Sequence, residues 1–360
     1  MDMNKNLEQT INDVNIENYE ELASPEIIVN EIPLTELAAK NVIETRQAIK
    51  EIMDKKDKRK IMIVGPCSIS DANSGLDYAK KIKFLSEEVK DKLLIIMRTY
   101  LEKPRTTLGW KGILYDPDLD NSNNIEKGLK IARKLLLEIN NLGIGCANEF
   151  VRTDFPQYTA DLISWSAVGA RSVEYPGCRE LASGLSMPVG FKNSTAGDIE
   201  AAVNACKAAK YSHRFPGLLM TGKPVIVKSR GNKYVHVVLR GGNGQPNYHP
   251  EKVDETIKLM RKAEIEPNII VDCSHANSNK IYEKQEEVAY AVLNQIVSEN
   301  SDIIGIMLES NLNSGSQPFP KNAEEIRNLR YGVSLTDSCI DFKTTETIVR
   351  NYYDRLNVRT

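Results

Sequence analysis

The chain has 360 residues, of which 41 % are apolar and 27 % are charged, as is typical of a globular protein. Its 47 Lys and Arg residues nearly balance its 49 Asp and Glu residues, and this net charge of −2 argues against a general binder of nucleic acid or membranes. No apolar run approaches the roughly 20 residues of a membrane span, and the polar N-terminal residues lack the apolar centre of a signal peptide, so we expect a cytoplasmic protein.

The first 54 residues precede the regular part of the sequence. Residues 26–33, EIIVNEIP, have the length and composition of one strand. The next segment carries apolar residues at helical spacing from Leu34 to Met53, which predicts an amphipathic helix. We therefore predict an N-terminal extension of one strand and one helix over residues 1–54.

From residue 55 onwards, strand-like and helical segments alternate. Eight short apolar runs have the length of buried strands, and they cover residues 61–68, 93–100, 144–150, 165–172, 188–193, 235–241, 268–277 and 303–310. Helical patterns lie between most of them, for example over residues 124–143 and 253–265. Continuous apolar runs are typical of parallel strands that are covered on both faces. Eight such strands predict an α/β fold, a (β/α)8 or TIM barrel, over residues 55–360.

One segment does not fit a simple barrel repeat. Residues 223–241 contain two strand-like runs that are joined by a polar SRGNK turn. We therefore predict an inserted β-hairpin over about residues 224–238, which leads into the sixth strand of the barrel.

Charged side chains stand at the C-terminal ends of the predicted strands. In a barrel these ends meet at one mouth, where the active sites of this architecture lie. The cations there are Arg98, Lys103, Arg105, Arg171, Lys192 and Arg240, and Glu149 ends the third strand. In a chain with a net charge of −2, this convergence of cations indicates an anionic ligand. The loop around Arg105 also offers hydroxyls that suit a phosphate; taken alone, it could instead be a solvated turn.

The remaining polar strand ends predict a metal site. They are Cys67, His275 and Glu309, and Asp337 lies in the C-terminal segment. One thiol, one imidazole and two carboxylates suit a divalent transition metal. The six cysteines form no CxxC pair, so we expect free thiols, which by default are buried apolar side chains. The alternative for His275 is a buried, hydrogen-bonded histidine that binds no metal.

Several long motifs identify a family. They are GPCSI (65–69), MRTYLEKPRTTLGWKG (97–112), GARSVEYPGCRELASGLSMPVGFKN (169–193), LRGG (239–242) and DCSHANS (272–278). From about residue 20 to its C-terminus, the chain closely resembles class I 3-deoxy-D-arabino-heptulosonate 7-phosphate (DAHP) synthase, of the type with an N-terminal regulatory extension.

The related 3-deoxy-D-manno-octulosonate 8-phosphate synthase shares the barrel and the phosphoenolpyruvate site. It carries a KANRSS-like stretch where this chain has KPRT (103–106). The KPRT form marks the four-carbon aldehyde, erythrose 4-phosphate, as the second substrate. The resemblance therefore implies a transferase that condenses phosphoenolpyruvate with erythrose 4-phosphate, the first step of the shikimate pathway to the aromatic amino acids.

The resemblance also implies roles for individual residues. Those that bind phosphoenolpyruvate are Arg98, Lys103, Arg171, Lys192 and Arg240. Those that bind erythrose 4-phosphate are Lys103, Pro104, Arg105 and Thr106. One divalent ion (Mn²⁺, Fe²⁺, Co²⁺ or Zn²⁺) is bound by Cys67, His275, Glu309 and Asp337. The catalytic groups are Lys103, Glu149 and Lys192.

In this family the N-terminal extension and the hairpin build a feedback site for an aromatic amino acid. Carried over by motif, that site is lined by Pro156, Gln157, Leu185, Ser186, Phe215 and Gly217. Glycine at position 217 favours tyrosine over phenylalanine as the effector. The family forms homodimers or homotetramers. The alternative is that both added pieces only cover barrel edges and form a subunit interface.

The sequence departs from the family at two places. Cys273 stands where an apolar residue is common, two positions before His275, and we expect it to serve packing. The loop over residues 311–332, which precedes Asp337, is longer than usual. Two other classes of protein remain to be tested: a Schiff-base aldolase that uses a lysine at a strand end, and a phosphosugar-binding protein without catalytic activity.

Overall fold

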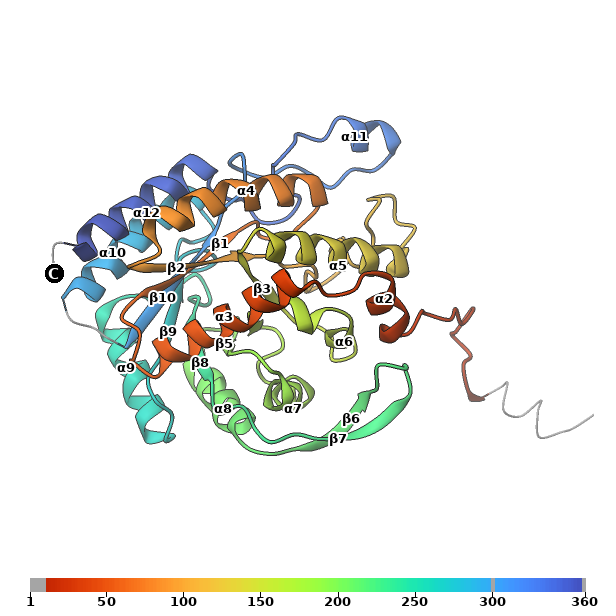
Figure 1. Cartoon of the computed structure of the whole chain (residues 1–360), viewed down its shortest axis with the longest axis horizontal. Helices are drawn as coiled ribbons and strands as arrows, with labels where there is room; N and C mark the ends of the chain where they lie inside the picture. The colour runs from red at the N-terminus through yellow and green to blue at the C-terminus, as the bar shows by residue number, and fades with distance from the viewer. Residues whose placement is uncertain (1–10, 299–301, 358–360) are drawn as a thin grey trace, which may run out of the picture.

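A closed barrel of eight parallel strands forms the centre of the molecule. The computed structural model describes residues 11–298 and 302–357, so residues 1–10 of the predicted extension lie outside the described residues. The strand order around the barrel is β1-β10-β9-β8-β5-β4-β3-β2 (Figure 1). The strands are β1 (Lys60–Gly65), β2 (Leu93–Arg98), β3 (Gly145–Glu149), β4 (Trp165–Val168), β5 (Val189–Lys192), β8 (Val235–Leu239), β9 (Ile269–Asp272) and β10 (Ile303–Glu309). Each falls within or overlaps one of the eight predicted runs, so the barrel prediction is confirmed.

Helices surround the barrel. They are α4 (Ala72–Val89), α5 (Ile125–Asn141), α6 (Pro156–Thr159), α7 (Pro176–Gly184), α8 (Ile199–Lys210), α9 (Pro250–Lys262), α10 (Gln285–Val297), α11 (Ala323–Arg327) and α12 (Phe342–Asn357). Two short 3₁₀ turns, η1 (Ala160–Leu162) and η2 (Tyr282–Lys284), precede β4 and α10. Side-chain caps start several of the helices: Asp71, Asn124 and Asp198 accept hydrogen bonds from backbone N–H groups of α4, α5 and α8. The helices predicted over 124–143 and 253–265 are confirmed as α5 and α9, although α9 begins earlier than expected.

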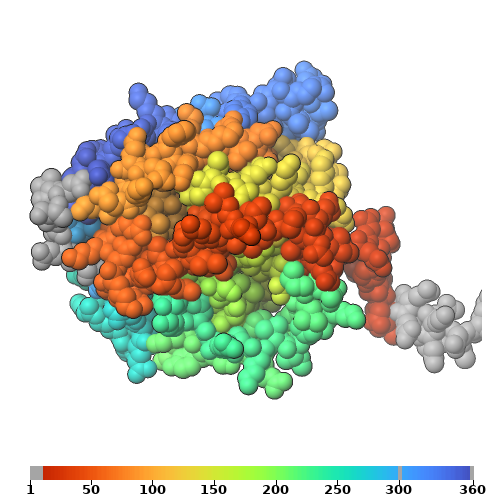
Figure 2. All heavy atoms as spheres, viewed as in Figure 1, coloured from red at the N-terminus to blue at the C-terminus, as the bar shows by residue number. Residues whose placement is uncertain are grey.

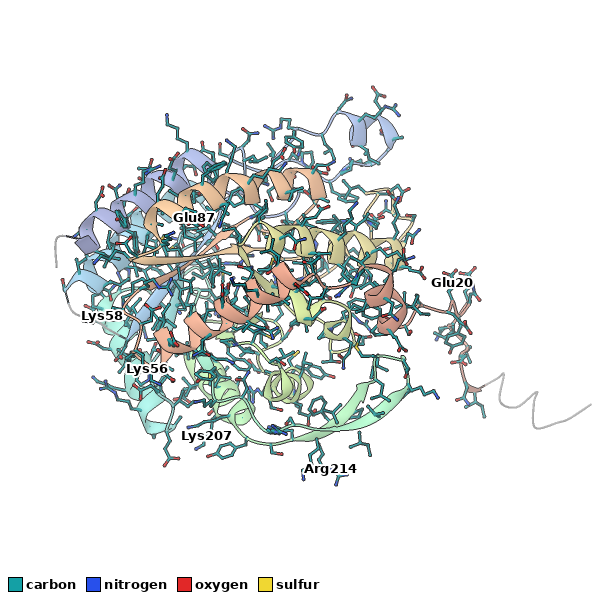
Figure 3. The ribbon with its side chains drawn as sticks, in the orientation of Figure 1. Glu20, Lys56, Lys58, Glu87, Lys207 and Arg214 are labelled. Carbon is teal, nitrogen blue, oxygen red and sulfur yellow. The ribbon has the colours of Figure 1, made fainter. Side chains whose placement is uncertain are left out.

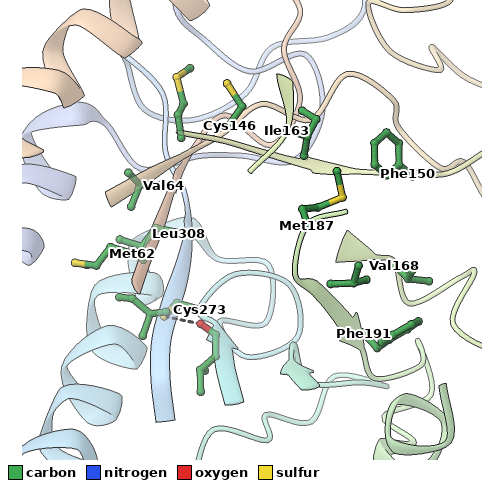
Figure 4. Packing of buried hydrophobic residues seen from close by; sticks show 14 of the residues in the cluster. Met62, Val64, Cys146, Phe150, Ile163, Val168, Met187, Phe191, Cys273 and Leu308 are labelled. Carbon is green, nitrogen blue, oxygen red and sulfur yellow. Dashed lines mark hydrogen bonds between the residues drawn. The ribbon is translucent and has the colours of Figure 1, made fainter. Parts of the chain in front are cut away.

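The apolar residues form two layers. Alternate residues of one strand contribute to different layers, as Ile61 and Ile63 of β1 fill the barrel while Met62 and Val64 pack outward against the helices. Figure 4 shows part of the outer layer, including Met62, Val64 and Cys273. The continuous apolar pattern of each strand therefore has a simple cause, because both faces of the sheet are covered.

The prediction of a strand over residues 26–33 is wrong. These residues form the helix α2 (Pro25–Glu31) and its C-terminal end. Pro25 occupies the first turn, where its fixed φ angle suits a helix and its missing N–H costs no hydrogen bond. A closed barrel also leaves no free sheet edge with which this segment could pair.

The predicted helix of the extension is confirmed as α3 (Glu36–Met53). Thr35 caps it, and its C-terminal apolar residues Ile49, Ile52 and Met53 pack with the residues that fill the barrel. Figure 2 shows α2 and α3 as a red-to-orange band across one face of the molecule. The extension therefore packs onto the barrel. The domain boundary after residue 54 stays a prediction.

The inserted hairpin exists, but its predicted boundaries are wrong. Strand β6 (Arg214–Leu218) pairs antiparallel with β7 (Pro224–Lys228), so the hairpin spans residues 214–228. The run at 235–239, predicted as its second strand, is the barrel strand β8, and both of its edges are taken by β5 and β9. It therefore has no edge left for β7. Pro216 and Gly217 hid β6 in the sequence because both residues are uncommon in strands.

Among the residues that the structure describes, no helix is both long enough and apolar enough to cross a bilayer.

Candidate active site

The charged strand ends converge at the C-terminal mouth of the barrel. Arg98 ends β2 and is 2 % exposed. Its guanidinium donates hydrogen bonds to the carbonyl oxygens of Pro66 and Cys67, and to Glu309 Oε1 at 2.9 Å. It also lies over the ring of Tyr100, 3.6 Å from the ring centroid. Arg98 thus joins three strands and holds a buried positive charge at the centre of the mouth.

Lys192 ends β5 between two buried carboxylates. Its Nζ lies 3.4 Å from Glu149 Oε2 and 3.3 Å from Asp272 Oδ2. Burial would lower the pKa of Lys192, but Tyr100, Asp272 and Glu149 raise it to about 12, so this group is an ammonium at neutral pH. Burial would likewise raise the pKa of Glu149, but Lys192 and Arg98 hold it below its usual value. The mouth therefore contains charged groups that stabilise one another away from water.

Three of the four predicted metal ligands come together. The ligand atoms of Cys67, Glu309 and Asp337 lie within 4.8 Å of one another, and they come from three separate segments of the chain. His275 is not within that group, although its Nε2 lies 3.8 Å from Glu309 Oε1. Its Nδ1 faces Asp272 Oδ2 at 3.0 Å.

The donor set fits a divalent transition metal. Burial and the neighbouring Glu309 carboxylate raise the pKa of the Cys67 thiol to about 11. Even with the Lys103 ammonium 2.8 Å from the sulfur, a further positive charge such as a bound metal ion is therefore needed to stabilise a thiolate at neutral pH. Soft sulfur together with carboxylate oxygen suits such a metal better than Mg²⁺ or Ca²⁺.

Lys103 connects the metal candidates to the KPRT loop. Its Nζ lies 2.8 Å from Cys67 Sγ and 2.9 Å from Asp337 Oδ2. Burial would lower the pKa of Lys103, but Cys67 and Asp337 hold it well above its usual value. A lysine of the predicted substrate loop and two predicted metal ligands therefore share one site.

In the rest of the KPRT loop, Pro104 is half-buried, while Arg105 and Thr106 are exposed and hydrogen-bonded. Arg105 Nε donates to the carbonyl oxygen of Trp110 at 2.8 Å, and Thr106 Oγ1 accepts from Arg171 Nε at 3.0 Å. Gly112 closes the loop at φ +111°, where a Cβ would lie 2.2 Å from the Leu101 oxygen. Glycine is thus required at the point where the loop returns to the barrel.

Arg240 and Arg171 lie on the same side of the mouth. Burial lowers the pKa of Arg240, and among its charged neighbours Asp272 raises that pKa while Arg171 lowers it. The Arg240 N–H donates to Asn193 Oδ1, which fixes the end of β8 to the end of β5. With Arg98 and Lys192, these residues place cations after four of the eight barrel strands, β2, β4, β5 and β8.

The sequence reasoning assigned no role to two buried residues that organise the site. Asp272 ends β9 and contacts Lys192 and His275; its position at a strand end was the available signal. Gln285 begins α10, where its side chain donates to the carbonyl oxygen of Glu309 and accepts from its N–H. Nothing in the local sequence marks Gln285, because its partner lies 24 residues away.

Cys273 lies among the outer apolar residues, as expected for packing. It is fully buried, and its thiol donates to the carbonyl oxygen of Val271 (Figure 4). Burial and the nearby Asp272 keep its pKa well above the usual value. This thiol is therefore unreactive.

The residues predicted for the effector site lie on three neighbouring elements. Pro156 and Gln157 are on α6, Leu185 and Ser186 follow α7, and Phe215 and Gly217 are on β6. Gln157 Nε2 donates to the carbonyl oxygen of Leu218 at 3.0 Å, which joins α6 to the hairpin. In Figure 1 these elements lie together below α5.

Comparison with known proteins identifies the family of this chain. The family model described as "DAHP synthetase I family" matches residues 35–350. The chain is 45 % identical over 347 residues to "Phospho-2-dehydro-3-deoxyheptonate aldolase, Tyr-sensitive" of Escherichia coli (strain K12), covering 96 % of each chain. It is 44 % identical to the Phe-sensitive enzyme of the same name and organism, covering 96 % of this chain and 98 % of that one.

A solved structure shows the same fold. The phospho-2-dehydro-3-deoxyheptonate aldolase of Francisella tularensis SCHU S4 superimposes with a TM-score of 0.93 at 44 % identity, covering 96 % of this chain and all of that one. The matching family model, the two enzymes of Escherichia coli and this structure agree with one another over nearly the whole length. The chain therefore belongs to the DAHP synthetase I family.

Proposed function

We propose that the cationic mouth of the barrel is where this DAHP synthase condenses phosphoenolpyruvate with erythrose 4-phosphate and water, giving DAHP and phosphate. The observation that carries the proposal is the position of Lys103. Its ammonium lies within 2.9 Å of two candidate metal ligands, and its loop begins the KPRT motif. One residue thus connects the site for the ion with the site for the aldehyde.

Phosphoenolpyruvate would bind among Arg98, Lys103, Arg171, Lys192 and Arg240. Its carboxylate and phosphate are both anionic, and guanidinium groups bind such groups through paired hydrogen bonds. Arg98 and Lys192 are buried and fixed by their neighbours, so little conformational entropy is lost when the ligand binds.

Erythrose 4-phosphate would bind to the KPRT loop through Lys103, Pro104, Arg105 and Thr106. Arg105 and Thr106 are exposed, which suits residues that receive a phosphate from solvent. The hydrogen bond between Arg171 and Thr106 joins the two half-sites. Both substrates are anions that repel each other in water, and fixing them side by side can contribute about 7–11 kcal/mol at best.

One divalent ion (Mn²⁺, Fe²⁺, Co²⁺ or Zn²⁺) would be held by Cys67, His275, Glu309 and Asp337. When bound, it supplies a Lewis acid that polarises the aldehyde oxygen. The Nε2 atom of His275 lies 3.8 Å from Glu309 Oε1, which supports His275 as the fourth ligand.

Side chains of the protein carry out the proton transfers. As C3 of phosphoenolpyruvate bonds to the aldehyde carbon, the Lys103 ammonium donates a proton to the forming alkoxide. Water then attacks C2, and Glu149, whose pKa stays low beside Lys192, accepts its proton. The C–O bond to phosphate breaks last. Lys192 orients phosphoenolpyruvate throughout.

A Schiff-base mechanism fits this site poorly. Lys192 would be its nucleophile, but two carboxylates hold this side chain as an ammonium with a pKa of about 12. A Schiff-base lysine instead needs a lowered pKa.

Regulation is proposed for the region of α6, α7 and the hairpin. An aromatic amino acid would bind among Pro156, Gln157, Leu185, Ser186, Phe215 and Gly217, with tyrosine favoured over phenylalanine because of Gly217. The chain would act as a homodimer or homotetramer. Relatives named as sensitive to tyrosine and to phenylalanine support an effector of this class.

The test follows the consumption of phosphoenolpyruvate by its ultraviolet absorbance. Erythrose 4-phosphate and arabinose 5-phosphate are compared, each with and without EDTA. We expect consumption only with the four-carbon aldehyde, its loss in EDTA and its return with Mn²⁺. Preference for arabinose 5-phosphate would contradict the role of the KPRT loop, and full activity in EDTA would contradict the metal site.

A further inference from the structure

Arg240 stands next to two glycines at the end of β8. It directly follows that strand and precedes Gly241 and Gly242. Gly241 adopts a φ of +67°, in the left-handed region that favours glycine. Because glycine restrains the backbone little, the local sequence does not fix the direction in which the Arg240 side chain projects.

The guanidinium of Arg240 is held less firmly than that of Arg98. Arg98 donates to the Glu309 carboxylate at 2.9 Å. Arg240 Nη1 donates instead to the carbonyl oxygen of Gly241, at the longer distance of 3.3 Å. The position of the Arg240 guanidinium therefore depends chiefly on how its backbone is held.

The backbone polar groups of Arg240 and Gly241 are hydrogen-bonded to other segments of the chain. The Arg240 N–H donates to Asn193 Oδ1 at 2.8 Å, and its carbonyl oxygen accepts from the Ala276 N–H at 3.2 Å. The Gly241 N–H donates to Asn247 Oδ1 at 2.7 Å, and its carbonyl oxygen accepts from Asn193 Nδ2 at 2.9 Å. Side-chain amides thus hold the backbone that the glycines leave free.

Three buried asparagines form one network around this backbone. Asn193, Asn247 and Asn277 are 0 %, 5 % and 4 % exposed. Asn247 Nδ2 donates to Asn193 Oδ1 at 3.0 Å, and the Asn247 N–H donates to Asn277 Oδ1 at 2.7 Å. Asn277 Nδ2 donates to the carbonyl oxygens of Leu239 and Asp272. Asn247 is the central member, because it contacts both of the others.

The amide of Asn193 is fully hydrogen-bonded. Its Nδ2 also donates to the carbonyl oxygen of Ser194, so the side chain makes two hydrogen bonds through its nitrogen and two through its oxygen. An asparagine can do this because its amide has both donors and acceptors. Buried polar networks whose groups are satisfied rigidify the backbone that they hold.

The network connects segments that carry proposed site residues. Asn193 follows Lys192 and precedes α8, whose Lys207 is labelled in Figure 3. Asn277 lies two residues after His275. The hydrogen bonds of the network therefore run between the ends of β5, β8 and β9.

We propose that Asn247 is a positioning residue that acts through Arg240 on the binding of phosphoenolpyruvate. The proposal rests on the role that is proposed above for Arg240. Without the Asn247 amide, the Gly241 N–H and one lone pair of Asn193 Oδ1 lose their partners. The Arg240 backbone is then free to shift, and its guanidinium no longer faces the anion in a fixed direction. The binding of erythrose 4-phosphate should be unaffected, because its proposed loop follows β2.

Steady-state kinetics of the full chain with Mn²⁺ test this proposal. Asn247→Ala should raise the KM for phosphoenolpyruvate about tenfold, as expected when a charged group loses one well-placed hydrogen bond. The KM for erythrose 4-phosphate should stay within about twofold of the wild-type value.

Asn140→Ala is the matched control. Asn140 is also fully buried, and its Nδ2 donates to the carbonyl oxygens of Leu136 and Leu162, away from the strand ends. This variant should lose stability in urea denaturation as Asn247→Ala does, but it should keep both KM values. The comparison separates positioning of the substrate from a general loss of stability.

A double-mutant cycle tests whether Asn247 acts through Arg240. Arg240→Met removes the guanidinium and should itself raise the KM for phosphoenolpyruvate. In that background, Asn247→Ala should change this KM by less than about twofold, because the group that it positions is gone. Asn247→Ser, whose side chain is too short to replace the amide, serves for the same comparisons if Asn247→Ala does not fold.

A rise of about tenfold in both backgrounds would overturn the proposal, because the effect of Asn247 would then be independent of Arg240. So would an unchanged KM for phosphoenolpyruvate in the folded Asn247 variant. An unchanged KM in Arg240→Met would refute the role of Arg240 in binding phosphoenolpyruvate, and the positioning role with it. The failures are distinguishable, because only the last one removes the effect of Arg240→Met.

Discussion

The Lys192 ammonium lies 3.3 Å from Asp272 Oδ2, and both side chains are almost completely excluded from solvent. Burial would raise the pKa of Asp272, but His275 and Lys192 hold it well below its usual value. Asp272 therefore carries a full negative charge between a predicted substrate-binding lysine and a predicted metal ligand. Asp272 thus links the predicted phosphoenolpyruvate site to the predicted metal site.

Replacing Asp272 by Asn should leave Lys192 with an incompletely balanced buried charge. We expect the free energy of unfolding to fall by about 3 kcal/mol, because breaking a buried ion pair exposes the cost of desolvating its partner. Urea denaturation measures this change. A double variant, Asp272→Leu with Lys192→Met, should recover part of the loss, and an additive loss in the double variant would show that the pair is not coupled.

Replacing Cys67 by Ala should abolish metal-dependent turnover while the barrel still folds. The sulfur is one of three grouped ligand atoms, so the affinity for Mn²⁺ measured by equilibrium dialysis should fall with it. Cys206→Ala removes a buried thiol from α8 and serves as the control for the loss of packing. Full turnover of Cys67→Ala in metal-replete buffer would show that Cys67 is not a metal ligand.

Replacing Arg105 by Ala should chiefly raise the KM for erythrose 4-phosphate. A hydrogen bond to a charged group contributes about 1.5–3 kcal/mol, which corresponds to a change of roughly ten- to a hundredfold. Steady-state kinetics with each substrate varied in turn provide the measurement. The Arg105→Lys variant keeps the charge, so its KM for erythrose 4-phosphate should rise less than that of Arg105→Ala. A selective change in the KM for phosphoenolpyruvate would place Arg105 in the other half-site.

Glu102 should make the stability of the folded chain depend on pH. Burial raises the pKa of this carboxyl from 4.5 to about 8. Between these values the unfolded chain releases the proton while the folded chain keeps it, so stability falls as pH rises, by up to about 1.4 kcal/mol per pH unit, and levels off above about pH 8.

Glu102→Gln removes this titration but keeps a side chain that can accept a hydrogen bond from the Val151 N–H. Urea midpoints of both proteins at about pH 5.5 and about pH 8 give the comparison. The variant should gain stability relative to the wild type as pH rises. A constant difference at both pH values would mean that Glu102 is ionised in the folded chain.

Inhibition by tyrosine should depend on Gly217. A Cβ at this position would lie 2.6 Å from Val227 Cγ2, so Gly217→Ser must displace the Val227 side chain on the paired strand of the hairpin. We expect the variant to lose sensitivity to tyrosine, with uninhibited turnover unchanged. Measuring the activity of both proteins at increasing concentrations of tyrosine, phenylalanine and tryptophan tests this expectation. If none of the three inhibits the wild type, the hairpin has only a structural role.

The barrel, and the charged residues at the ends of its strands, could be predicted from local patterns in the sequence. Parallel strands that are buried on both faces require continuous apolar runs, and this pattern is local. Because the barrel brings the C-terminal ends of these strands to one place, the order of the runs also predicted that Arg98, Lys192 and Arg240 would meet. This prediction needs only local patterns and does not depend on knowing which distant segments pair.

Which segments pair and which buried groups face one another became clear only from the folded arrangement of the chain. The partner of β7 is β6 because β8 has both of its edges in the barrel. The contacts of Gln285 with Glu309 depend on segments that are far apart in the chain. Hydrogen bonds and ion pairs of this kind leave no periodic pattern, because they depend on distances that are fixed only after the chain has folded.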